Sequence, residues 1–197
     1  TLVSIWPLFA GLSLIGLAVG VQGSLLGVRA ELEGFDDYLI GLLMSCYFAG
    51  FLAGSLLTPK MIQRVGHIRI FAALSAVASV TILVHSIYVN PWAWALMRLL
   101  TGFAFSTIYV VSESWLNQAS NNTNRGQVLS IYTAILLAGI CAGQFMLNVA
   151  NPREFTLFIL ISVMVSVAAV PILLSVITTP AIEETERVTM RHLWYRT

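Results

Sequence analysis

The chain has 197 residues, of which 58% are hydrophobic and 10% are charged, and its formal net charge is +1. Soluble domains carry about 25% charged residues, so this composition excludes a disordered chain and argues against a water-soluble globule. The balanced charge, without a basic run, also excludes nucleic acid as a partner. We therefore predict an integral membrane protein whose first partner is the lipid bilayer.

Six apolar segments follow one another along the chain, and each is long enough to cross a bilayer, which takes about 20 helical residues. Five of them lie in stretches without Asp, Glu, Lys or Arg, whereas the fourth carries Arg98 and Glu113. The pattern predicts an all-α integral membrane fold with six transmembrane helices, over residues 4–28, 38–58, 70–89, 92–117, 127–149 and 155–177.

The connections between these segments are short, apart from the end of the chain. The first segment opens with Trp6 and Pro7, typical of an interface anchor with proline in the first helical turn. The dipeptides Asn90-Pro91 and Asn151-Pro152 predict turns before the fourth and sixth helices. We expect a six-helix bundle over 1–177, followed by a cytoplasmic linker or interfacial tail over 178–197.

The distribution of Lys and Arg predicts the orientation. With a cytoplasmic N-terminus, the outer connections hold Arg29 and Arg153. The inner connections and the tail then hold Lys60, Arg64, Arg69, Arg125, Arg187, Arg191 and Arg196. Because inner loops are enriched in basic residues, both termini are predicted to be cytoplasmic in a multi-pass protein of the plasma membrane, here a bacterial inner membrane.

Pairs of glycines four residues apart occur in the second and fifth segments, as Gly50/Gly54 and Gly139/Gly143. Such a stripe lets two membrane helices approach closely. The sequence leaves two partners open for these stripes. They pack either inside the same bundle or against a second bundle.

Arg98 lies inside the fourth segment, where an unpaired guanidinium costs several kcal/mol. Its fork can hold a carboxylate or a phosphate, which favours substrate recognition or proton coupling. The alternative is a structural clamp on the first or fifth helix through carbonyls, Gln22 or Gln144. Polar side chains inside a membrane tend to face a cavity or a partner, so Gln22, Thr101 and Gln144 are candidates to line a solute cavity with Arg98.

Glu113 follows Arg98 by fifteen residues, about 22 Å along a helix, so the two cannot pair. We expect Glu113 at the cytoplasmic end near Arg64 or Arg125, either as a latch of an inner gate or as a static salt bridge. Packing roles are favoured over titrating roles for His67 and His85. Catalytic sets, metal-spaced clusters and phosphate loops are absent from the sequence, so no enzyme, cofactor or metal is predicted.

Two stretches resemble the signature motifs of the major facilitator superfamily. In the basic stretch 59–69, Arg64, Gly66 and Arg69 match the Arg-x-Gly-x-x-Arg core of the family's loop after helix two, while Gln63 stands where the family usually has Asp. In the fourth segment, Arg98 and Gly102 match the Arg-x-x-x-Gly of the second motif. The order and positions of these motifs are similar to those of the family's N-terminal half, over the whole chain.

The resemblance implies a fold and a mechanism. It implies half of a major facilitator fold, built from inverted three-helix repeats, in a secondary transporter that works by alternating access with its solute near the midplane. It implies that helices two and five pack on a second six-helix half, supplied by a continuation of the chain, a homodimer or another subunit. It also implies an inner gate formed by Arg64, Gly66, Arg69, Glu113 and Arg125.

The expected function is ion-gradient-driven transport of a small, possibly anionic, solute. The alternative is a non-transport accessory or assembly subunit that uses its glycine faces to hold a larger membrane complex. The half length of the chain favours this alternative, whereas Arg98 and the basic stretch favour transport.

Overall fold

The computed structural model describes residues 2–174, all of whose regular elements are helical. The elements are α1 (Leu2–Leu32), α2 (Asp37–Val65), α3 (His67–Ile87), α4 (Pro91–Ala119), α5 (Arg125–Phe145), the short 3-10 helix η1 (Met146–Asn148), α6 (Thr156–Ala168) and α7 (Val170–Leu174). They form six spans long and apolar enough to cross a membrane, with α6 and α7 making the sixth. The expectation of six transmembrane helices is thus confirmed, and the expected tail over 178–197 lies outside the described residues.

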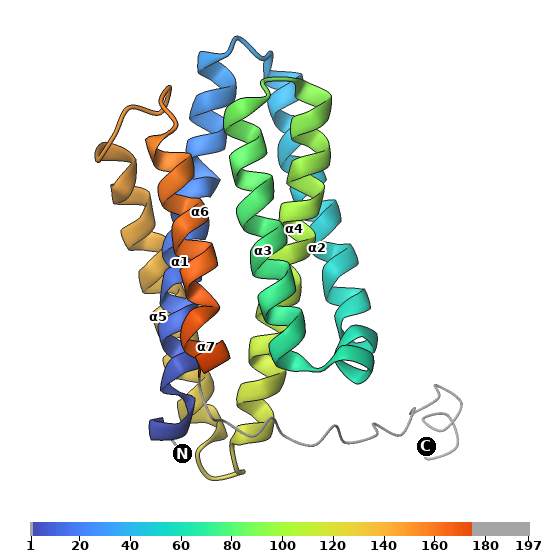
Figure 1. Ribbon diagram of the computed structural model, residues 1–197, viewed down its shortest axis with the longest axis vertical. Helices are drawn as coiled ribbons and strands as arrows, with labels where there is room; N and C mark the ends of the chain where they lie inside the picture. Colours follow the sequence, from blue (N-terminus) through green and yellow to red (C-terminus); the bar gives the residue numbers. More distant parts are fainter. Residues whose placement is uncertain (1, 175–197) are drawn as a thin grey trace, which may run out of the picture.

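The helices stand side by side along the long axis of the molecule (Figure 1). The largest interfaces join α2 to α4, α1 to α5, α3 to α4, α1 to α6, and α3 to α6. This set of interfaces is unchanged when α1 is exchanged with α4, α2 with α5 and α3 with α6. The α2–α4 interface then corresponds to α1–α5, the α3–α4 interface corresponds to α1–α6, and the α3–α6 interface corresponds to itself. Because the exchanged helices run in opposite directions, the contacts have the symmetry of two inverted three-helix repeats, as the sequence predicts.

Glycines allow the backbones to touch in the two central pairs, α2–α4 and α1–α5. A Cβ atom added to Gly50 or Gly54 would come within 3.0 Å of a backbone carbonyl oxygen of α4. One added to Gly143 would meet a backbone carbonyl of α1 equally closely, and Gly139 packs on the Gly16 backbone. The stripes therefore pack inside this bundle, and the alternative of a contact with a second bundle through these glycines is wrong.

Local sequence signals set the helix starts. The side chain of Asp36 accepts a hydrogen bond from the Leu39 amide at 2.8 Å and caps α2. The side chain of Asn90 accepts from the Trp92 and Ala93 amides, and Pro91 occupies the first turn of α4, where its missing N–H costs nothing. The turn predicted from Asn90-Pro91 is thus present.

The basic stretch 59–69 is not a loop, which corrects the sequence-based expectation. Helix α2 continues through Pro59 to Val65, and α3 begins at His67. A single residue, Gly66, joins the two helices with a φ of +87°, a value that L side chains rarely adopt. The family-like motif is therefore a sharp corner between two helices.

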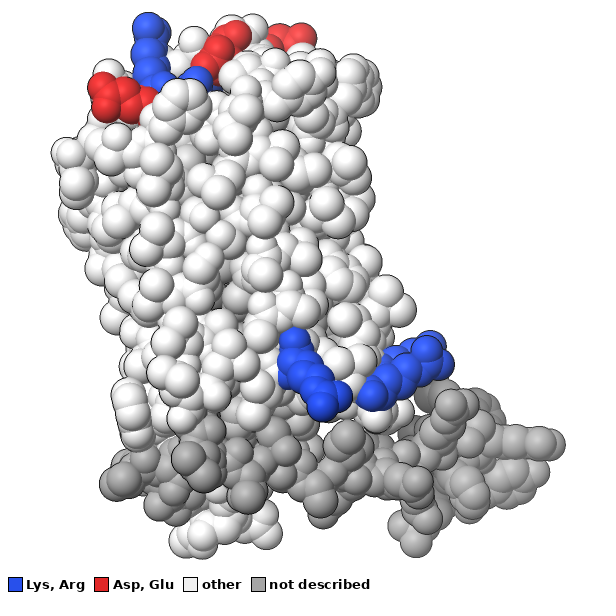
Figure 2. Space-filling view, in the orientation of Figure 1, with Lys and Arg blue, Asp and Glu red and all other residues white. Residues whose placement is uncertain are grey.

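Charged residues gather at the two ends of the bundle and leave an uncharged belt between them on the face that Figure 2 shows. Acidic residues cluster at the end where α1 passes into α2, as Glu31, Glu33, Asp36 and Asp37. The opposite end carries the basic residues of the α2–α3 and α4–α5 connections. This separation is the one expected of a bundle that spans a membrane.

Candidate functional site

Arg98 lies seven residues into α4 and is 5% exposed. Its guanidinium carbon lies 4.4 Å from the ring centroid of Tyr47 on α2, and Nη2 lies 3.3 Å from the sulfur of Met44. Nε is buried and has no hydrogen-bond partner within the described part of the chain. The side chain therefore faces α2, and a clamp on α1 or α5 is not formed.

The other three candidate cavity residues lie in different surroundings. Gln22 on α1 is 2% exposed, and its amide nitrogen has no partner among residues 2–174. The hydroxyl of Thr101 lies 2.6 Å from the Met97 carbonyl oxygen and 3.0 Å from the Thr81 hydroxyl, inside the α3–α4 interface. Gln144 is exposed near the end of α5. No hydrogen bond joins any of the three to Arg98 in residues 2–174.

A row of tyrosines continues from Arg98 along the same side of α4. Tyr109, three turns further on, has a buried hydroxyl without a hydrogen-bond partner in the described region. Its ring lies 6.2 Å from that of Phe51 on α2, which in turn lies 6.1 Å from the Tyr47 ring. The Tyr132 hydroxyl donates to a carboxylate oxygen of Glu113 at 3.1 Å. Ring contacts join α2 to α4 in this row, and the Tyr132–Glu113 hydrogen bond joins α5 to α4. No sequence pattern links these tyrosines, because they lie on three different helices.

The expected inner gate is not closed by an ion pair in this structure. Glu113 is exposed and contacts Tyr132, and Arg125 donates to the Asn117 side chain at 2.6 Å. Arg64 and Arg69 are exposed on either side of the Gly66 corner. Residues 2–174 contain one ion pair, at the opposite end of the bundle. The expected pairing of Glu113 with Arg64 or Arg125 is therefore absent here.

His67 supplies a neutral contact at this same end. Its Nε2 lies 3.1 Å from the Ser114 hydroxyl, and its ring packs 6.2 Å from that of Trp115, both on α4. His67 is 1% exposed although sequence reasoning placed it in a loop. The residue is a packed member of the α3–α4 interface.

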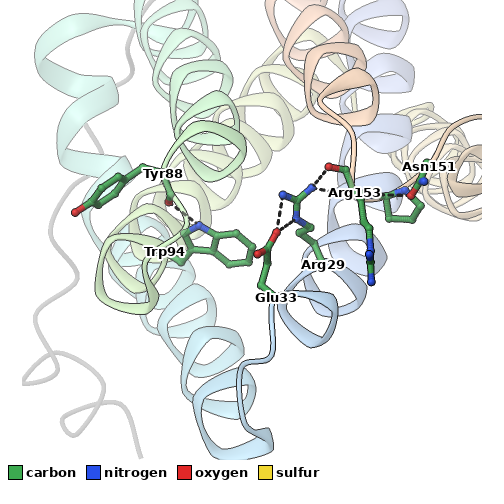
Figure 3. Close-up of polar contacts among 7 residues, drawn as sticks. Arg29, Glu33, Tyr88, Trp94, Asn151 and Arg153 are labelled. Atoms are coloured by element: carbon green, nitrogen blue, oxygen red, sulfur yellow. Dashed lines mark hydrogen bonds and ion pairs between the residues drawn. The ribbon is translucent and has the colours of Figure 1, made fainter.

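Arg29 makes the one ion pair of the described chain, and sequence reasoning missed it. The residue lies in the last turns of α1, not in a loop, and its guanidinium is 2.6 Å from the Glu33 carboxylate. It also donates to the carbonyl oxygens of Pro152 and Arg153 in the connection between α5 and α6 (Figure 3). Arg29 thereby ties the end of α1 to the second repeat. The spacing of Arg29 and Glu33, four residues apart, was the available signal.

The described residues offer no metal centre. No group of three His, Cys, Asp or Glu side chains in residues 2–174 is placed to hold a metal ion. The charged group of the candidate site is Arg98, which lies against a tyrosine ring and a thioether of α2. A guanidinium whose neighbours are weak acceptors can bind an anion.

Comparison with known proteins identifies relatives over most of the chain. The family model of the Major Facilitator Superfamily matches residues 8–193. A protein of Enterobacter sp. (strain 638), named an uncharacterized MFS-type transporter, is 30% identical over 91% of this chain and 47% of its own length. Similarly named proteins of Yersinia enterocolitica and Escherichia fergusonii are 29% and 28% identical, each over 84% of this chain and 44% of the relative. The chain spans about half the length of these curated relatives.

Proposed function

Because the chain belongs to the major facilitator superfamily, we propose that it forms one six-helix half of a secondary active transporter. The complete transporter moves a small, anionic solute by alternating access, in which two halves rock about a shared central site under the drive of an ion gradient. The names of the relatives support a transport role, and they do not favour the alternative of an accessory subunit.

The observation that carries the anionic assignment is the state of Arg98. A guanidinium in a membrane is normally paired, because burying an unpaired charge is costly. Arg98 is 5% exposed, yet its neighbours in the described structure are a tyrosine ring and a thioether, and its Nε has no acceptor. A carboxylate or phosphate group of a solute would supply the missing acceptors through a bidentate contact.

The second half of the transporter is proposed to cover α2 and α5. These two spans are much less buried within the bundle than the other four. The glycines of these two helices pack on α4 and α1 inside the bundle, so the partner would contact the outward-facing side chains instead. These side chains surround a shallow hollow on α5, which is lined by Leu129, Ser130, Thr133, Ala134 and Leu137. A continuation of the chain, a second copy or another subunit could each provide this partner.

The inner gate is proposed at the end that carries the Gly66 corner. Arg64, Arg69 and Arg125 are exposed there, and Glu113 accepts a single hydrogen bond, from the uncharged Tyr132, that an ion pair could replace. We assign an open gate to the present structure. When the inner side closes, Glu113 would form an ion pair with one of these arginines. Gly66 allows the corner between α2 and α3 to be this tight.

The orientation with cytoplasmic termini is also part of the proposal. Among the described residues, Lys60, Arg64, Arg69 and Arg125 lie at the end that would face the cytoplasm, against Arg29 and Arg153 at the other end. This bias supports the positive-inside assignment in a bacterial inner membrane.

The test of the anion site uses the purified complete transporter in detergent. Its unfolding temperature is measured with sodium acetate, lactate, benzoate and sulfate, and with glycerol and glucose as uncharged controls. We expect at least one anion to stabilise the wild type and the Arg153→Gln control, because the Arg153 side chain is exposed and belongs neither to the anion site nor to the gate. The stabilisation should vanish in Arg98→Gln. Stabilisation by neutral solutes alone, by no solute, or equally in Arg98→Gln would overturn the anionic assignment.

A further inference from the structure

His85 is a buried base near the end of α3 that the proposed function does not yet use. The side chain is 1% exposed, and Nδ1 lies 2.7 Å from the carbonyl oxygen of Thr81. A carbonyl oxygen only accepts hydrogen bonds, so Nδ1 carries the proton of the neutral ring, and Nε2 carries the lone pair. Nε2 is buried and has no hydrogen-bond partner in the described structure. The ring therefore presents an unused proton acceptor inside the membrane span.

The neighbours of this ring hold it in one place. The Trp94 ring packs edge-on against His85 with centroids 5.4 Å apart. The Nε1 atom of Trp94 donates to the Tyr88 carbonyl oxygen at 3.0 Å (Figure 3). The Phe35 ring also packs against Trp94, at 5.2 Å between centroids.

Arg98 is the charged residue of α4 that lies beside this contact. It follows Trp94, whose ring packs on His85, by one helical turn, and it precedes Thr101, whose hydroxyl bonds the side chain of Thr81, the residue that also bonds His85. Two positive charges in a site of low dielectric repel each other strongly. A proton on His85 is therefore opposed as long as the charge of Arg98 is not compensated.

No carboxylate of the described chain compensates this charge. The neighbours of Arg98 on α2 are the thioether of Met44 and the ring of Tyr47, and neither α6 nor α7 contains an ionisable residue. Of the acids at this end of the bundle, Glu33 pairs with Arg29, Asp36 caps α2, and Glu31, Asp37 and Glu154 are exposed. The compensating charge must come from outside the described residues.

We infer that His85 binds the proton that travels with the solute, and that it does so when an anion occupies Arg98. This inference rests on the anion site proposed above. The anion cancels the repulsion, a proton from solvent adds to Nε2, and the Nδ1–H bond to Thr81 stays intact. By reciprocity, the proton increases the affinity for the anion by the same factor. The two cargoes are then bound together and released together, as a symporter requires.

The experiment follows protons directly. A weakly buffered solution of the purified complete transporter at near-neutral pH receives sodium acetate, lactate, benzoate or sulfate, and a pH-sensitive dye reports proton uptake while calorimetry reports anion binding. In the wild type we expect up to one proton taken up for each anion bound. In His85→Asn, whose amide can still donate to Thr81, we expect anion binding to persist, weakened severalfold, with no proton taken up.

A matched control is His67→Asn, which removes the other buried histidine of the described chain, at the opposite end of α3. Its proton uptake should equal that of the wild type. Proton uptake that persists in His85→Asn, or anion binding to the wild type without proton uptake, would overturn the role of His85 and leave the anion site standing. Absence of anion binding in every protein would instead overturn the proposed function. Unfolding temperatures close to that of the wild type establish that both variants are folded.

Discussion

Replacing Gly50 by alanine tests the backbone contact between α2 and α4. The new Cβ would lie within 3.0 Å of the carbonyl group of Leu99, which cannot rotate away because it belongs to the backbone of α4. The two helices must therefore separate, and such overpacking costs typically about 1–3 kcal/mol. We place the cost near the upper limit, because the neighbour is backbone. Alanine recovers about 1 kcal/mol through its higher helix propensity, so the net loss should be about 2 kcal/mol.

The matched control is Gly41→Ala in the same helix, where no atom lies within 4 Å of the added Cβ. This substitution should leave stability unchanged or raise it by up to about 1 kcal/mol. Reversible unfolding of both variants in mixed micelles gives the two free energies on one scale. If Gly50→Ala were as stable as Gly41→Ala, the backbones of α2 and α4 would not be in contact, and the helix pairing described above would be refuted.

Two further predictions concern polar contacts and use the same unfolding assay. Arg29→Met should lower the free energy of unfolding by about 2–4 kcal/mol, since hydrogen bonds to charged groups contribute about 1.5–3 kcal/mol each and Glu33 loses its partner. Arg153→Met, at an exposed side chain, should change it little, and equal losses in both variants would contradict the role of Arg29. Tyr132→Phe should cost about 0.5–1.5 kcal/mol, less than the loss of a buried bond to a charged group, because Glu113 is exposed to solvent. An unchanged free energy of unfolding would contradict a stabilising role of this bond.

The number and approximate extent of the helices could be predicted because a membrane imposes a minimum length of uncharged chain. The position at which α2 ends could not be predicted from the sequence. Pro59 usually stops a helix, and nothing in the sequence indicates that α2 continues through it to Val65. The same limit placed Arg29 in a connection, although α1 extends to Leu32. Both errors arise where the helix leaves the apolar belt and its composition no longer marks it.

The candidate site was predicted in part. Arg98 stands out in sequence because a charge in an apolar segment is rare, and the structure places it in a buried position. Thr101 was grouped with it, but three residues along a helix turn a side chain by about 60° away, and the structure directs Thr101 to α3 instead of α2. His85 and Arg98 belong to different helices, so their proximity depends on the α3–α4 pairing, which hydropathy does not reveal. The glycine stripes likewise indicate close packing without identifying the partner helix.

The pairing of helices across the two repeats has a consequence for how the protein is made. Helices that follow each other in the chain, α1 with α2 and α2 with α3, share few contacts, whereas α1 packs on α5 and α2 on α4. When the first three helices have entered the membrane, the glycine face of α1 has no partner until the end of α5, near Phe145, has been synthesised. Assembly is therefore a late event that interleaves the two repeats, and a nascent chain that stops after α3 exposes glycine-lined faces to lipid and to other proteins of the membrane.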